Sequence, residues 1–278
     1  MLITDAQIHV WEVDRPDRPW PVPARNRPQR EGGFSAEEAL AEMDSAGVDR
    51  AVIVPPTWVG ENNLTALEAA AAYPDRFAVM GRFDPNAPDA EDRLAHWLDQ
   101  PGMLGIRVTF LATPRPEQLD DGSLDWFWAA CERHRIPLML WMTGMAPKTA
   151  PIAERHPDLT IVLDHMARDL ALEPAEVWRD LDDVLALARF PRVSVKVSSV
   201  PNFSGEPYPH RDVHPHLRRL FDAFGSDRLH WGTDVTRLRG TYVDCLRLFR
   251  DELDFLGAED RALILGGSLA DRLGWPED

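Results

Sequence analysis

The segment ITDAQIHVW, residues 3–11, decides how the whole chain is interpreted, because polar and apolar residues alternate through most of it. As a β-strand it puts Asp5, Gln7 and His9 on one side, since side chains alternate between the two faces of a strand. Burying an acid, an amide and an imidazole is costly unless they bond to one another or to a ligand. The segment therefore predicts a strand that carries part of a site.

Seven further apolar runs are predicted strands. They are AVIVP (51–55), FAVMGRF (77–83), MLGIRVTF (103–110), PLMLWM (137–142), TIVLDH (160–165), VSVKVSS (193–199) and LHWGTD (229–234). Segments with apolar residues at helical spacing lie between them, and the first begins at Ser35, with Glu38 at the capping-box spacing. Strands that alternate with helices in this way predict a single-domain (β/α)8 TIM barrel over residues 1–278, an α/β fold. A doubly wound open sheet is the alternative, but no glycine-rich turn follows the first strand.

The composition excludes several classes of partner. A formal net charge of −16 argues against nucleic acid, which binds basic surfaces. No run approaches the roughly 18 apolar residues of a membrane helix, and no basic and apolar leader precedes the first strand. Cys131 and Cys245 are expected to be reduced core residues. We expect a cytoplasmic protein that acts on a small molecule; whether it forms a homo-oligomer stays open.

Polar residues recur where the later strands are predicted to end, notably at Arg107, His165, Lys196 and Asp234. In a barrel the carboxyl ends of the strands meet at one rim, so these side chains are expected to converge. Lys196 lies among valines and is one of only two lysines in the chain. It is expected to be a site residue, the partner of an inward carboxylate such as Asp5 or Asp234, or both.

Five motifs in order carry a family resemblance: DAQIHVW (5–11), LDHMAR (163–168), VSVKVSS (193–199), HWGTDVTR (230–237) and ILGGSLADRLGW (264–275). Together they resemble the amidohydrolase superfamily, in the branch of 2-pyrone-4,6-dicarboxylate lactonase and the sugar-lactone hydrolases. The resemblance covers nearly the whole chain. It implies a barrel hydrolase that opens a lactone or related cyclic ester of a small, carboxylated or polyhydroxylated substrate, with His9, His165 and Asp234 at the family's site positions.

Two departures from the family pattern concern metal binding. Gln7 stands where the family's first strand has its first histidine, and the fifth strand ends in Trp141, Met142 and Thr143 without a histidine or lysine. Zinc normally takes at least three protein ligands, and an amide is a poor one. We therefore expect no cofactor and no tight catalytic metal. The alternative is one divalent ion, zinc, held by His9, His165 and Asp234.

These features assign roles by chemistry. Asp234 is the expected base for water, and His9, His165 and Lys196 are expected to polarise the carbonyl or protonate the leaving oxygen. The residues expected to contact the substrate are polar, cationic or aromatic and lie at strand ends or in the following loops: Gln7, Trp20, Arg107, Trp141, Arg168 and Arg237. Arginine suits a substrate carboxylate. Two alternatives remain, a metal-dependent decarboxylase or amidohydrolase of the same superfamily, and a barrel that has lost its chemistry and only binds ligand.

Overall fold

The computed structural model describes residues 2–21, 28–110 and 114–275, and it contains one sheet of parallel strands in the order of the sequence. The strands are β1 (Thr4–Ile8), β2 (Arg50–Ile53), β3 (Phe77–Arg82), β4 (Met103–Thr109), β5 (Leu138–Trp141), β6 (Ile161–Leu163), β7 (Val193–Ser198) and β8 (Leu229–Gly232). The sheet curls so that its last strand returns to its first, where Asp234 N donates a 2.9 Å hydrogen bond to Gln7 O. The predicted eight-stranded barrel is confirmed.

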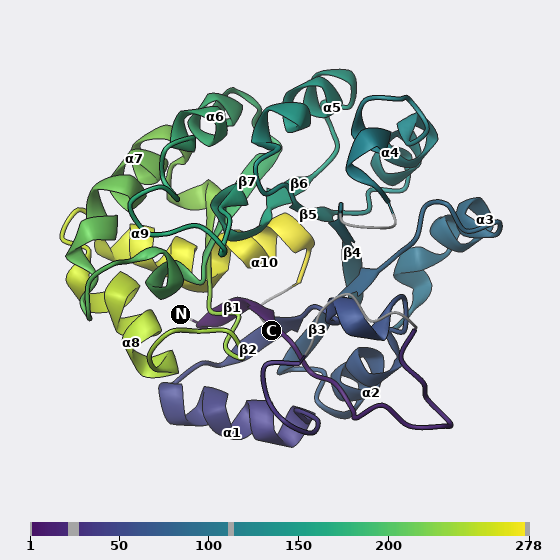
Figure 1. The fold of residues 1–278 in the computed structure, drawn as a ribbon, viewed down its shortest axis with the longest axis horizontal. Coiled ribbons are helices and arrows are strands. Elements are labelled where there is room, and N and C mark those ends of the chain that lie inside the picture. The colour runs from purple at the N-terminus through teal and green to yellow at the C-terminus, as the bar shows by residue number, and fades with distance from the viewer. Residues whose placement is uncertain (1, 22–27, 111–113, 276–278) are drawn as a thin grey trace.

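Helices surround the strands on the outside (Figure 1). They are α1 (Ala36–Ala46), α2 (Leu64–Ala72), α3 (Ala90–Ala95), α4 (Asp125–Arg133), α5 (Thr149–Arg155), α6 (Leu181–Leu185), α7 (His214–Phe224), α8 (Tyr242–Arg247), α9 (Ala258–Ala262) and α10 (Ser268–Leu273). The predicted capping box of α1 is present, because Ser35 accepts from Glu38 N and the Glu38 carboxylate accepts from Ser35 N. Within the described residues no helix is long and apolar enough to span a membrane.

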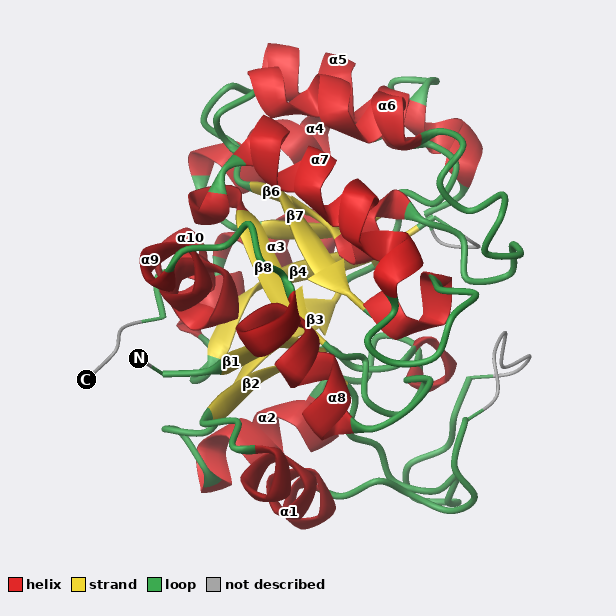
Figure 2. Ribbon diagram, turned by 90° about the vertical axis from the view of Figure 1, so that its left-hand side faces the viewer, coloured by secondary structure: helices red, strands yellow, loops and turns green. Residues whose placement is uncertain are grey.

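The barrel interior is apolar at one end and polar at the other. Ala6, Val52, Met80, Met139 and Val162 form an inner cluster against Leu269 and Leu273 of α10. Helix α10 lies at this same end of the barrel (Figure 2). The opposite end, where the strands finish, carries the polar side chains. The fold therefore leaves the carboxyl-end rim for a site, as is usual for such barrels.

One prediction about β1 is wrong: Asp5 does not share a face with Gln7 and His9. Ala6 is the residue that packs into the inner cluster, while the Asp5 carboxylate accepts a 2.7 Å hydrogen bond from the hydroxyl of Tyr242 on α8. The pairing of β1 with β2 shifts register between Asp5 and Ile8. Such an irregularity breaks the alternation, so residues on either side of it no longer share a face.

The predicted strands also extend too far. His9, His165 and Asp234 lie just beyond the ends of β1, β6 and β8, in the first residues of the following loops. His165 and Asp234 have left-handed φ values of 51° and 54°. Non-glycine residues rarely take this conformation, and where they do the surrounding structure must hold it. Both cysteines are free and buried, as predicted.

Candidate active site

His9 and Asp234 face each other across the seam between the first and last strands. His9 Nε2 lies 3.0 Å from Asp234 Oδ1, and both side chains are almost fully buried. His9 Nδ1 lies 2.6 Å from the Val54 carbonyl oxygen, which can only accept, so Nδ1 carries a hydrogen. Nε2 then faces an oxygen of the Asp234 carboxylate, so the two atoms can pass a proton between them. Burial alone raises the pKa of Asp234, but the charge and hydrogen bond of His9 bring it well below its usual range.

His165 is held as a neutral imidazole. Lys196 Nζ donates a 2.8 Å hydrogen bond to Gln7 Oε1, so the Gln7 amide nitrogen is the group 3.2 Å from His165 Nε2. His165 Nε2 therefore accepts, and Nδ1 donates to Ser198 Oγ at 2.8 Å. Burial lowers the pKa of His165 to about 4. The expected polarising role is wrong for this arrangement, because Nε2, which lies 3.8 Å from Asp234 Oδ2, has no hydrogen to donate.

Asp164, which the sequence analysis missed, is the partner of the buried lysine. Its Oδ1 lies 2.8 Å from Lys196 Nζ and its Oδ2 accepts a 2.9 Å hydrogen bond from Arg107 Nε. Burial alone raises the pKa of Asp164, but Lys196 and Arg107 lower it to about 2. The predicted ion pair of Lys196 with an inward carboxylate is therefore confirmed, but the carboxylate is that of Asp164 and not that of Asp5 or Asp234. Because Asp164 and Gln7 occupy Nζ, we treat Lys196 as a positioning residue.

Asp5 joins by hydrogen bonds the two chain segments that carry His9 and Asp234. Its carboxylate accepts hydrogen bonds from the backbone N–H groups of Gln7 and Thr233, both at 2.9 Å, and from the hydroxyls of Thr233 and Tyr242. Burial raises the pKa of Asp5 to about 6. The residue is structural and does not face the site.

The two loop arginines differ. Arg168 donates to the carbonyl oxygens of Met166, Val177 and Asp180 and to the Asp180 carboxylate. Its guanidinium thus holds the loop that follows β6, and the expected substrate contact of Arg168 is wrong. Arg237 is half-buried beside Asp234, whose pKa its charge helps to lower. It stays a candidate for substrate binding.

Aromatic side chains form one wall of the site. The ring of Trp58, in the turn Thr57–Val59 after β2, lies 6.4 Å from His9 and 6.4 Å from Trp20 between centroids. Trp20 thus approaches the site through Trp58. The indole Nε1 of Trp58 is buried and has no hydrogen-bond partner in the described structure. Trp141 ends β5 and is half-buried. Trp58 was not predicted, although a tryptophan three residues after the end of a predicted strand (51–55) is a usable signal.

Arg82 is a third residue that was not predicted. It ends β3 and pairs in register with Arg107 of β4, and its side chain is half-buried. The signal was present, because FAVMGR finishes an apolar strand with a cation.

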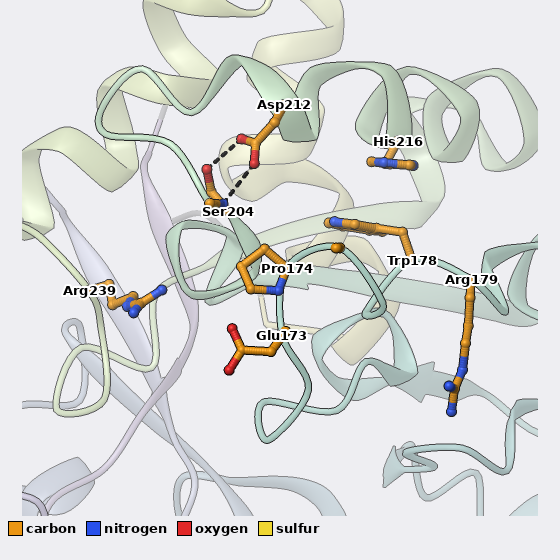
Figure 3. Close-up of a pocket in the computed structure, with 10 residues that line it drawn as sticks. Glu173, Pro174, Trp178, Arg179, Ser204, Asp212, His216 and Arg239 are labelled. Atoms are coloured by element: carbon orange, nitrogen blue, oxygen red, sulfur yellow. Dashed lines mark hydrogen bonds between the residues drawn. The ribbon is translucent and has the colours of Figure 1, made fainter.

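A separate cavity of about 860 Å³ lies between the loops that follow β6, β7 and β8 (Figure 3). Trp178 and His216 stack in it with ring centroids 4.5 Å apart, and Ser204 donates to the Asp212 carboxylate. Its lining shares no residue with the cluster around His9 and Asp234. The cavity is therefore distinct from the candidate catalytic groups.

The donor set does not suit a tightly held metal. Among the residues that the structure describes, no group of three or more histidine, cysteine or acidic side chains is arranged to hold one. His165 Nε2 faces the Gln7 amide, and His9 Nε2 faces Asp234 directly. These atoms point at one another and not at a common point where a metal ion could bind. Gln7 also stands where the family resemblance places a histidine ligand.

An eight-stranded α/β barrel with a His–Asp pair and buried cations at its carboxyl rim is compatible with a barrel hydrolase, and comparison with known proteins supports this class. The amidohydrolase family model matches residues 4–268. The L-fucono-1,5-lactonase of Burkholderia ambifaria is 30% identical over 275 residues, which cover 95% of this chain and 92% of that protein. The chain belongs to the amidohydrolase family and is a hydrolase.

Solved structures share the fold. A probable 2-pyrone-4,6-dicarboxylic acid hydrolase from Acinetobacter baumannii, with citric acid bound, superposes with a TM-score of 0.80 at 19% identity over 99% of this chain and 100% of that one. An amidohydrolase from Burkholderia multivorans with bound zinc superposes with a TM-score of 0.82 at 22% identity over the same shares. Zinc therefore occurs in this fold.

Proposed function

We propose that this protein hydrolyses a lactone, using the His9–Asp234 pair and no bound metal. The 3.0 Å contact between the two buried side chains is the observation that carries the proposal. The lactonase relative, identical at 30% of positions, supports the substrate class. The free, buried Cys131 and Cys245 fit the reducing cytoplasm, where we propose that it works.

The pair can take up and donate the protons that ester hydrolysis requires. Asp234, ionised at rest, takes a proton from the water that attacks the lactone carbonyl carbon. When the bond to the ring oxygen breaks, that oxygen takes the proton held on His9 Nε2. The proton on Asp234 then passes to His9 across the 3.0 Å contact, which restores the resting state. One water is consumed and one hydroxy acid forms.

Neighbouring groups support this sequence. Arg237, beside Asp234, stabilises the negative charge that develops on the carbonyl oxygen. Arg107 uses only Nε for Asp164, so its terminal nitrogens are available for a substrate carboxylate.

The test is ring opening by wild-type protein and variants, followed with a pH indicator on carboxylated and neutral sugar lactones. Asp234→Asn keeps the shape but removes the base, and we expect turnover to fall by about 10²–10⁴-fold. Asp222→Asn on the exposed face of α7 is the matched control and keeps wild-type turnover. Equal activity of Asp234→Asn and wild type on a true substrate overturns the mechanism. Ligand binding without any turnover favours the non-hydrolytic alternative.

A metal-dependent reaction is the second candidate. One observation favours it. The Asp234 carboxylate lies within 4 Å of both His9 and His165, and the family resemblance places all three residues at site positions. Stoichiometric zinc or manganese that survives dialysis supports this candidate.

A further inference from the structure

The β3–β4 side of the rim has more positive than negative charge. Arg82 ends β3 and Arg107 lies on the neighbouring β4, while a third cation, Lys196 of β7, shares the Asp164 carboxylate with Arg107. One buried carboxylate, that of Asp164, bonds to both Arg107 and Lys196. Arg82 has no carboxylate within 4.0 Å among the described residues, and the single hydrogen bond of its guanidinium there is a 3.4 Å contact from Nη1 to Thr109 Oγ1.

The acidic residues that surround Arg82 are engaged elsewhere. The Glu61 carboxylate lies 2.8 Å from Arg93 Nη2. Asp84, two residues after Arg82, accepts from Asn86 N. The stretches 22–27 and 111–113, which the structure does not describe, contain no Asp or Glu in the sequence. Among the residues that the structure describes, this half-buried guanidinium is thus left without an anion.

The structure also holds Arg82 in place. Asn63 Oδ1 accepts a 2.8 Å hydrogen bond from Arg82 N, and Asn63 Nδ2 donates to Arg82 O at 3.0 Å. These two bonds fix the end of β3, and register with Arg107 sets the two side chains on the same side of the sheet. Burial and the Arg107 charge together lower the pKa of Arg82 to about 9, so the charge is kept at a cost.

We propose that Arg82, with the terminal nitrogens of Arg107, forms an anion subsite that makes the enzyme specific for lactones bearing a carboxylate outside the ring. A carboxylate there accepts hydrogen bonds from two guanidinium groups and supplies the missing negative charge. The inference rests on the proposed function and decides between carboxylated and neutral polyhydroxylated lactones as its substrates. A neutral lactone leaves the positive charge of Arg82 without an anion.

The test compares D-glucaro-1,4-lactone, which carries a carboxylate, with D-glucono-1,4-lactone, which has a hydroxymethyl group at the same position. Wild-type protein is expected to prefer the carboxylated lactone in kcat/KM. Arg82→Met is expected to lower the ratio of the two kcat/KM values by roughly 100-fold, chiefly through KM, and Arg82→Lys to lower it less. Arg218→Met, an exposed arginine on α7, is the control and leaves the ratio unchanged.

Binding separates this inference from the proposed function. Calorimetric titration with glucarate, a dicarboxylate, is expected to show an affinity at least about 10-fold weaker for Arg82→Met than for wild type. Asp234→Asn is expected to bind glucarate but not turn over lactone. If wild type opens no lactone yet Arg82→Met loses glucarate affinity, the subsite stands and the proposed function fails. Equal glucarate affinity, no glucarate binding by wild type, or an unchanged ratio of kcat/KM values overturns the subsite. A melting temperature of Arg82→Met at or above that of wild type excludes misfolding as the cause.

Discussion

The Lys196 ammonium donates a 2.8 Å hydrogen bond to the side-chain carbonyl oxygen of Gln7, and this bond sets the chemistry of the rim. It turns the Gln7 amide nitrogen toward His165 Nε2 and keeps that imidazole neutral. A histidine at this position would present a nitrogen lone pair or a single N–H instead. The replacement of the family's first histidine by Gln7 is therefore coupled to Lys196 and Asp164, which hold the amide in one orientation.

Gln7→Glu tests this coupling. A carboxylate keeps the bond from Lys196 but has no N–H for His165 Nε2, so the protonated imidazole gains a nearby anion. The pKa of His165, about 4 in the wild type, is expected to rise by one unit or more. NMR titration of the imidazole signals measures it. An unchanged titration of His165 contradicts the assigned orientation of Gln7.

Lys196→Met tests the buried ion pair. It leaves Asp164 buried with Arg107 as its remaining cation. Removing one partner of a buried pair typically costs about 3–5 kcal/mol in the free energy of unfolding, because the other charge stays buried. Denaturant unfolding measures this loss. Lys148→Met, at the partly exposed second lysine, is expected to cost less than about 1 kcal/mol; equal losses for the two variants contradict the assignment.

His165 also predicts a pH dependence of stability. Its folded-state pKa of about 4 lies below the ordinary 6.5, so the unfolded chain binds more protons between these values. The stability that neutral His165 contributes is complete above pH 6.5 and is lost as the pH falls toward 4, by about 3 kcal/mol in total.

Asp5 acts in the opposite direction. Its pKa is raised from 3.8 to about 6, so its contribution to the free energy of unfolding falls as the pH rises through that range. The comparison of wild type with His165→Gln, unfolded in urea from pH 4 to 7, isolates the histidine. The difference between the two curves is expected to grow with pH, and a difference independent of pH rejects the prediction.

Tyr242→Phe tests how the barrel seam positions the catalytic pair. It removes one hydrogen bond to Asp5, which joins β1 to the residue after β8. We expect a loss of about 1–2 kcal/mol in the free energy of unfolding and a lower kcat, with KM nearly unchanged. Tyr208→Phe removes a partly buried hydrogen bond to Glu252, away from the seam, and is the control. A change in KM alone indicates that Tyr242 acts in another way.

The sequence pattern predicted the barrel because helices and strands alternate regularly, and VSVKVSS placed Lys196 on the inner face correctly. It also brought His9 and Asp234 to one rim, since strand ends converge in any such barrel. It misplaced Asp5 because the register shift after that residue breaks the period of two, which no local pattern records.

Partners between distant strands could not be predicted. Arg168 was assigned to the substrate, but its acceptors belong to the loop that folds back after β6. Asp164 was missed although it lies two residues after the inward-facing Val162. Arg82 was missed although it ends a strand. Which cations a single carboxylate neutralises depends on the lateral register of β3, β4, β6 and β7, and only the structure gives it.

The most direct measurement is the turnover of enzyme samples that contain different amounts of metal. Protein stripped with a chelator, and the same protein after addition of graded zinc or manganese, are assayed for ring opening while bound metal is quantified by mass spectrometry. With the His9–Asp234 pair as the proton carrier, the rate per chain is predicted to stay constant across the series. A rate that vanishes in stripped protein and rises in proportion to bound metal contradicts it.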